Sequence, residues 1–104
     1  MEWQDKWRAL ISLTGTTADN YVGTDINGQW YVHLSGVEIA DGAFLCSRTG
    51  RGDTPQLAIE KTWDDLAYLK STEWIVVRAN SDQRRCLRWN GFMWEDYSPP
   101  RRIA

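Results

Sequence analysis

The dipeptide Asn90-Gly91 separates two short segments that contain aromatic and other apolar residues, 84–89 and 92–97. Short segments of this kind on either side of turn residues are typical of paired β-strands. Asn-Gly favours a two-residue hairpin turn, because both central residues of a type I′ turn need positive φ. The sequence therefore predicts an antiparallel hairpin with one apolar face. The pairs expected on that face are Trp89 with Phe92, Leu87 with Trp94, and Arg85 with Asp96.

A third strand, residues 74–79, is predicted to precede this hairpin across a polar turn at residues 80–83. Four loop residues would pair Trp74 with Trp89 and Val76 with Leu87, which adds Trp74 and Val76 to the core face. The same register sets Arg78 opposite Arg85. Because like charges directly opposite each other repel, either both arginine side chains turn away towards the sheet edge, or the turn is one residue longer or shorter than four. The C-terminal third is thus expected to be a three-stranded meander.

Two segments, residues 2–13 and 55–70, have the spacing of amphipathic helices. Thr54 is a good N-cap for the second, and Pro55 stands at the first helical position, where its missing N–H costs nothing. In each helix the apolar residues form a stripe along one face. The stripe consists of Trp3, Trp7, Leu10 and Ile11 in the first helix, and of Ile59, Trp63, Leu66 and Leu69 in the second.

The region between the helices is predicted to form hairpins. Residues 20–34 turn at Asn27-Gly28, and two short strands, 37–40 and 43–46, flank Asp41-Gly42, followed by a polar loop at 47–52. In the first hairpin the expected pairs are Asp25 with Trp30, Gly23 with Val32, and Tyr21 with Leu34. The fold class is α+β, a single domain over 1–104 whose antiparallel sheet is packed by two helices, with a loose tail at 98–104.

Composition supports one modest core. The chain has 104 residues, 42% of them hydrophobic and seven of them tryptophan. Each tryptophan buries on the order of 200 Å², so a few can build most of a small core. With a polar N-terminus and no long apolar run, we expect a cytoplasmic protein with reduced Cys46 and Cys86. No cofactor or metal site is expected, since His33 is the single histidine and there is no Cys-x-x-Cys pair.

No catalytic motif stands out. His33 lies on a predicted strand with no partner motif beside it. Asp64-Asp65 falls on a polar helix face, and Glu95 and Asp96 point to opposite faces of a strand. The glycine-containing loop 48–54 precedes a helix N-terminus but matches no phosphate-binding spacing, and Asp53 would repel phosphate. A small enzyme that uses His33 or this loop is the least favoured of three hypotheses.

The second face of the meander suggests binding. Residues 78–102 carry a charge of +3 and the rest of the chain −5. Arginines beside aromatic rings at 84–97 permit a single-stranded nucleic-acid-binding module, although rings on a core face cannot serve as an open stacking platform. A protein-binding patch is favoured over it, because arginine, tyrosine and methionine are enriched at interfaces. Either the first helix covers this face or a partner does. The candidate patch is Ile75, Val77, Arg84, Arg88, Met93 and Tyr97.

The segment from about Gly52 to Tyr97 resembles small accessory proteins of phages and prophages. The resemblance is carried by the Thr54-Pro55 helix start, the position of Trp63 and the hairpin sequence of residues 89–95. Many such proteins bind a host or defence component, and anti-CRISPR inhibitors are the best-known group. The resemblance implies a non-enzymatic inhibitor or adaptor in the host cytoplasm, with a host defence nuclease complex as partner; a homodimer is compatible with it.

Overall fold

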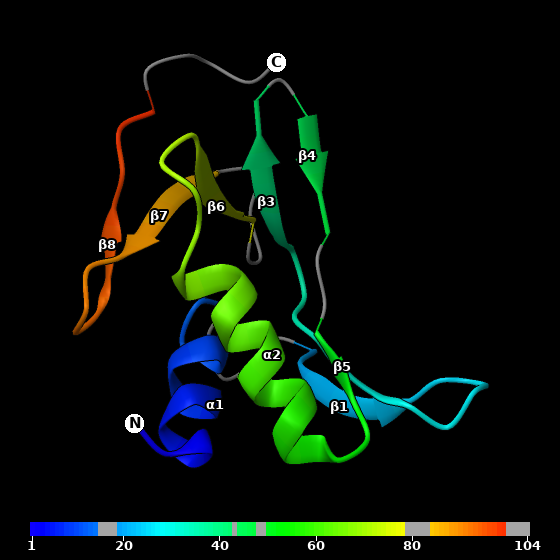
Figure 1. Ribbon diagram of the computed structural model, residues 1–104. Coiled ribbons are helices and arrows are strands. Elements are labelled where there is room, and N and C mark those ends of the chain that lie inside the picture. Colours follow the sequence, from blue (N-terminus) through cyan, green and yellow to red (C-terminus); the bar gives the residue numbers. More distant parts are fainter. Residues whose placement is uncertain (15–18, 43, 48–49, 79–83, 100–104) are drawn as a thin grey trace.

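The computed structural model describes residues 1–14, 19–42, 44–47, 50–78 and 84–99, and these form two helices and two antiparallel sheets (Figure 1). The predicted α+β class is confirmed. Of the predicted tail, residues 98 and 99 have no regular structure, and residues 100–104 lie outside the described residues, as does the predicted turn at 80–83.

Both predicted helices are present. The first, α1, spans Trp3–Ile11, and the second, α2, spans Pro55–Ala67. Thr54 Oγ1 accepts a hydrogen bond from the Leu57 backbone N–H at 3.2 Å, which satisfies one of the free N–H groups at the start of α2. The helix ends three residues earlier than predicted, because Tyr68 leaves the helical region with φ −112° and ψ 53°.

The strands divide between two sheets, where the sequence predicted hairpins around one. Strand β5 was not predicted, since its two residues fell within the polar loop 47–52. The three-stranded sheet has the order β1 (Tyr21–Thr24), β2 (Trp30–His33), β5 (Arg51–Gly52). The five-stranded sheet has the order β4 (Phe44–Cys46), β3 (Val37–Asp41), β6 (Glu73–Val77), β7 (Arg85–Trp89), β8 (Trp94–Asp96).

The predicted register of the first hairpin is wrong by one residue. Val22 pairs with Val32, and Thr24 pairs with Trp30. The loop is longer than Asn27-Gly28, because the Asp25 N–H donates to the Gln29 carbonyl oxygen at 2.9 Å. A shift of one residue turns every side chain of a strand to the other face. Val22 therefore faces the core in place of Tyr21.

The register between β6 and β7 is also shifted by one. Ile75 pairs with Leu87 and Val77 with Arg85, whereas Val76 pairs with Cys86. This is the predicted alternative in which the turn differs by one residue, and Arg78 does not face Arg85. Ile75 and Val77 consequently lie in the principal core beside Leu87. Trp74 and Val76 lie on the opposite face of the sheet.

The β7–β8 hairpin exists, but its register differs from the prediction by two residues. Trp89 pairs with Trp94, and Leu87 pairs with Asp96. A shift of two keeps each side chain on its predicted face, so the hairpin still presents an apolar side to the core. Phe92 is the exception, because it lies in the turn and not opposite Trp89.

The principal core lies between the helices and the sheets. Leu10, Val32, Ile39 and Ile75 are fully buried there, and Trp63 from α2 is nearly so. A smaller cluster on the other face of the five-stranded sheet consists of Ala40, Trp74 and Val76, with Leu45, Cys86 and Tyr97 packed against it. The helices thus cover the face that carries Ile75 and Val77.

Candidate partner-binding surface

The six residues predicted to form a patch are not all on one surface. Ile75 and Val77 are 0% and 3% exposed, so the shifted register removes both from any accessible face. Arg84 is exposed, and Arg88 and Tyr97 are half-buried neighbours. Met93 is 60% exposed and lies at the hairpin end, in a different groove from Arg88 and Tyr97. The predicted patch therefore separates into two surfaces.

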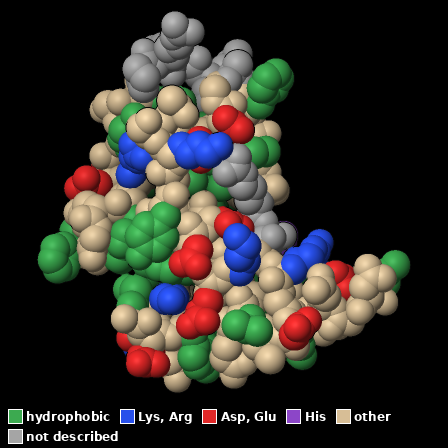
Figure 2. Space-filling view, in the orientation of Figure 1, with side chains coloured by type: hydrophobic (Ala, Val, Ile, Leu, Met, Phe, Trp, Pro, Cys, Tyr) green, Lys and Arg blue, Asp and Glu red, His purple; other side chains and the backbone are tan. Residues whose placement is uncertain are grey.

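The first surface is a groove of about 580 Å³ between the residues that follow α2 and the β7–β8 hairpin. We call it the Tyr68 groove. Tyr68 is 73% exposed, and Figure 2 shows apolar side chains over this end of α2. The residues used below are Tyr68, Arg88, Trp89, Glu95, Asp96 and Tyr97.

The Arg88 side chain is held in place within the Tyr68 groove. Its Nη2 donates to the Lys70 carbonyl oxygen at 3.0 Å, and its guanidinium lies 5.1 Å from the centre of the Tyr97 ring. The Tyr97 ring in turn packs 5.8 Å from the Trp74 ring. A cation fixed over an aromatic face loses little further freedom on binding a partner.

The sequence prediction missed Tyr68. This residue lies outside the apolar stripe of Ile59, Trp63 and Leu66, within what was expected to be a continuous helix to residue 70. The sequence offered one sign that Tyr68 is exposed: its aromatic side chain lies outside the apolar stripe. The structure exposes the ring by ending the helix at Ala67, so that Tyr68 faces outward where the chain turns towards β6.

The second surface lies at the end of the hairpin. A groove of about 440 Å³, which we call the Phe92 groove, separates α1 from this end of the molecule. Phe92 is 91% exposed and Met1 is 65% exposed beside it. Apolar side chains are visible at the hairpin tip in Figure 2. The groove residues used below are Met1, Arg8, Ser12, Arg85, Leu87 and Trp94.

The turn explains why Phe92 points outward. Asn90 Oδ1 accepts hydrogen bonds from the backbone N–H groups of Phe92 and Met93 at 2.8 and 2.9 Å. The Asn90 N–H donates to the Met93 carbonyl oxygen at 3.1 Å, and Gly91 has φ +105°, a conformation that glycine adopts without strain. The turn therefore centres on Gly91-Phe92 and not on Asn90-Gly91.

Three tryptophans hold the hairpin against α2. The ring of Trp63 lies 4.7 Å from that of Trp89 and 5.7 Å from that of Trp94, with the rings close to perpendicular. Trp94 Nε1 also donates to the Ala9 carbonyl oxygen of α1 at 2.8 Å. These rings pack against one another and against the core, an arrangement that differs from the open stacking platform of single-strand-binding proteins.

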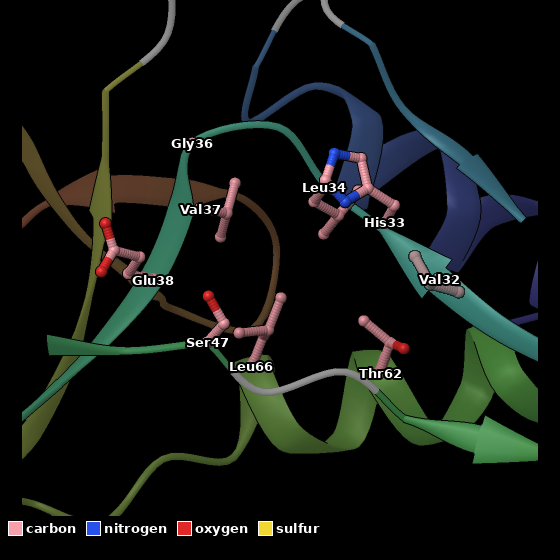
Figure 3. A pocket seen from close by; sticks show the side chains of 9 residues that line it. All are labelled: Val32, His33, Leu34, Gly36, Val37, Glu38, Ser47, Thr62 and Leu66. Carbon is pink, nitrogen blue, oxygen red and sulfur yellow. The ribbon is translucent and has the colours of Figure 1, made fainter. Parts of the chain in front are cut away.

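His33 lines a cavity of about 200 Å³ between the two sheets, with Glu38 and Ser47 (Figure 3). Its ring stacks on Tyr21 at 4.9 Å. Among the described residues, no hydrogen bond joins the His33 ring to Ser47 or Glu38, and Figure 3 shows the three groups directed apart. On the same side of β1 and β2, a side-chain hydrogen bond with Tyr31 raises the pKa of Tyr21.

The loop 48–54 has a packing role where it is described; residues 48 and 49 lie outside the described residues. A Cβ on Gly50 would lie 2.4 Å from the Thr62 backbone nitrogen, so only glycine allows this approach to α2. Arg51 forms an ion pair with Asp25 at 3.4 Å and lies over the Tyr31 ring.

Comparisons with protein-family models, curated protein sequences and solved structures find no match for this chain. Within the described ranges, no group of three His, Cys, Asp or Glu side chains is placed to hold a metal ion. None of the helices in the described parts of the chain has the length and apolar character needed to cross a membrane.

Proposed function

We propose that this chain is a non-enzymatic protein-binding protein, an inhibitor or adaptor, whose partner docks in the Tyr68 groove. The observation that carries the proposal is Tyr68 itself, 73% exposed beside the ordered Arg88–Tyr97 pair. Tyrosine, tryptophan and arginine are the residues that most often dominate binding energy at protein interfaces. All three line this groove, through Tyr68, Trp89 and Arg88.

The chemistry of the groove suggests the kind of segment that it accepts. Glu95 and Asp96 are exposed along it, while Arg88 is already engaged with Lys70 and Tyr97. The exposed side chains that a partner would meet are thus aromatic, from Tyr68, and acidic, from Glu95 and Asp96, which contact Asn90 and Arg85 in the single chain. A protein segment with an apolar or aromatic side chain next to a basic residue would complement both.

The class of partner is a further part of the proposal. The resemblance of residues 52–97 to phage accessory proteins supports an anti-defence role of the anti-CRISPR kind. Nucleic-acid-binding proteins carry basic surfaces, so a host nuclease complex offers basic segments of the kind described above. The partner's identity, and the phage origin, rest on the resemblance and stay predictions.

The test is affinity capture from the native host with the wild type and with Tyr68→Ala and Arg88→Glu variants. The captured protein is identified by mass spectrometry, purified and titrated by calorimetry. We expect Tyr68→Ala to weaken binding by about 2 kcal/mol, roughly thirtyfold in Kd, because a hot-spot ring is lost.

Ile26→Ala is the matched control, because Ile26 is fully exposed at the tip of the β1–β2 loop, on the opposite side of the molecule from the β7–β8 hairpin (Figure 1). This variant should bind the purified partner as the wild type does. If Tyr68→Ala and Arg88→Glu both bound it with unchanged affinity, the Tyr68 groove would not be the binding site.

A further inference from the structure

We propose that the Phe92 groove is a second docking site, which binds an acidic protein segment that carries an apolar side chain. The groove lies between α1 and the β7–β8 hairpin, and Leu87 and Trp94 supply part of its apolar lining. Phe92, 91% exposed, and Met1, 65% exposed, extend this apolar surface to the outside. Exposed apolar patches of this kind are typical of interaction sites.

The charge of the groove indicates what it accepts. Among the described residues, Arg8 and Arg85 are the only charged side chains that line it. Arg8 belongs to α1 and Arg85 to β7, and their side chains are 73% and 63% exposed. A carboxylate that enters the groove would therefore meet a cation from the helix or from the strand.

Both arginines also pair with a carboxylate outside the groove, and they keep donors to spare. Arg8 Nη1 donates to Asp5 Oδ1 at 3.0 Å, and Arg85 Nη2 donates to Asp96 Oδ1 at 3.3 Å. Each is a single hydrogen bond within the described ranges, whereas a guanidinium has five N–H donors. Asp5 and Asp96 do not line the groove, and exposed pairs of this kind contribute little to stability. An acidic segment can thus bind both arginines without breaking either pair.

The spacing along β7 gives the length of the segment. Arg85, Leu87 and Trp89 stand at alternate positions of this strand, and all three line the groove. At about 3.3 Å per residue, Arg85 and Trp89 lie about 13 Å apart, the length of about four extended residues. Phe92 follows Trp89 in the turn that leads to β8. The segment should therefore carry an acidic residue about two to four positions from an apolar one.

Two other occupants fit the groove less well. In a symmetric dimer the same surface meets itself, so Arg8 and Arg85 would approach the arginines of the second copy, and like charges repel. Segments that bind anionic membranes carry clusters of about four to eight basic residues, and two line this groove in the described part of the chain. A groove with one cation from each of its two elements suits a single stretch of protein chain.

The two grooves beside the hairpin differ in charge. Glu95 and Asp96 are the exposed charged side chains of the Tyr68 groove, and neither lines the Phe92 groove. Trp89 contributes to both. One chain can therefore hold two segments of opposite charge, which is the arrangement that an adaptor needs.

Selection from a library of short random peptides displayed on phage tests the proposal. Peptides are selected on the immobilised full chain, and those that also bind a Phe92→Ser variant are removed. The remaining peptides should carry aspartate or glutamate about two to four positions from an aromatic or large aliphatic residue. Remaining peptides that are rich in lysine or arginine would overturn the proposal, as would the absence of any peptide that depends on Phe92.

Ser12 offers a matched pair of variants for the charge, because it lines the groove and can be replaced by long side chains of either sign. The affinity of a selected peptide is measured by calorimetry. Ser12→Glu should raise the Kd of the peptide about tenfold, whereas Ser12→Lys should lower it or leave it unchanged. Equal losses of affinity in both variants would mean that the groove does not recognise charge, and the proposal would be wrong.

Arg51→Glu is the control for Arg8→Glu. Arg51 also forms an exposed ion pair, with Asp25, but it lies in β5, on the other side of α2 from the hairpin (Figure 1). Arg8→Glu should weaken the selected peptide about tenfold, and Arg51→Glu should leave its Kd unchanged. Equal effects would contradict a site at Arg8. Tyr68→Ala should not alter the affinity of this peptide, so the two grooves are tested separately.

Two further measurements cover the other occupants. Sedimentation equilibrium of the full chain should give the mass of one chain at all concentrations. A dimer that Phe92→Ser abolishes would assign the groove to a second copy and overturn the proposal. Cosedimentation with phosphatidylserine vesicles that Phe92→Ser abolishes would assign it to a membrane surface, with the same consequence.

Discussion

Two tryptophans of the five-stranded sheet have indole N–H groups in contrasting surroundings. Trp94 Nε1 donates to the Ala9 carbonyl oxygen and so joins the hairpin to α1. Trp74 lies on the other face of the sheet, 4% exposed, and its Nε1 is buried without a hydrogen-bond partner among the described residues. A buried donor without an acceptor costs free energy, whereas a paired one stabilises the fold.

Replacing each ring by phenylalanine should separate these effects. Trp94→Phe removes the hydrogen bond to Ala9 and is expected to lower the free energy of unfolding by about 1 to 3 kcal/mol. Trp74→Phe makes the same change in size but removes an unpaired donor. We therefore expect it to lower the free energy of unfolding by less than Trp94→Phe does. Urea unfolding monitored by far-ultraviolet circular dichroism measures both. A loss for Trp74→Phe as large as that for Trp94→Phe would contradict the assignment.

At the scale of the element, β6 shows why a pattern of apolar residues leaves the register of a strand open. All five residues of β6 are buried, because both faces of this strand are covered. A strand that is apolar on both faces fits its neighbours equally well in two registers that differ by one residue. This is why Trp74 and Val76 were predicted for the face that Ile75 and Val77 occupy. Ile75 and Val77, which were predicted for the partner-binding patch, were misplaced for the same reason.

The contact between β5 and α2 yields a prediction at this scale. Thr62 Oγ1 donates to the Ala58 carbonyl oxygen at 2.8 Å and accepts from the Gly50 N–H at 3.0 Å, which draws the backbone ahead of β5 against the helix. Gly50→Ala should destabilise the protein by about 1 to 3 kcal/mol, because its Cβ would overlap the helix backbone.

Gly23→Ala is the control, since the nearest atoms to a Cβ there would be in the Tyr31 and Tyr21 side chains, at ordinary distances of 3.4 Å and more. Thermal unfolding of the two variants should show a clear decrease in Tm for Gly50→Ala and a smaller change for Gly23→Ala. Equal Tm values would mean that α2 yields to the added methyl group.

At the scale of the whole molecule, α2 is the element that joins the two sheets. Trp63 packs against Trp89 and Trp94 of the five-stranded sheet, and Thr62 binds the segment that enters the three-stranded one. Leu66, 2% exposed, faces the cavity between the sheets. Shared packing on one helix predicts that both sheets unfold together.

Leu66→Ala tests this expectation. The truncation should lower the free energy of unfolding by about 2 to 5 kcal/mol, because a buried leucine leaves a cavity. Tryptophan fluorescence reports mainly on the Trp63–Trp89–Trp94 cluster, and circular dichroism reports on the whole backbone. The two probes should give coincident transitions in the wild type and in the variant, with lower midpoints in the variant. Separate transitions would show that the sheets are independent.

The sequence by itself determined the local features that short-range chemistry controls. The helix start at Thr54-Pro55, the two amphipathic helices and the order of strands in the meander follow from capping, periodicity and turn residues. Tertiary structure decided the strand registers, the pairing of β5 and the exposure of Tyr68 and Phe92. These depend on which turn bonds form and on which of two apolar faces meets the helices, and both choices are made by packing between segments distant in the sequence.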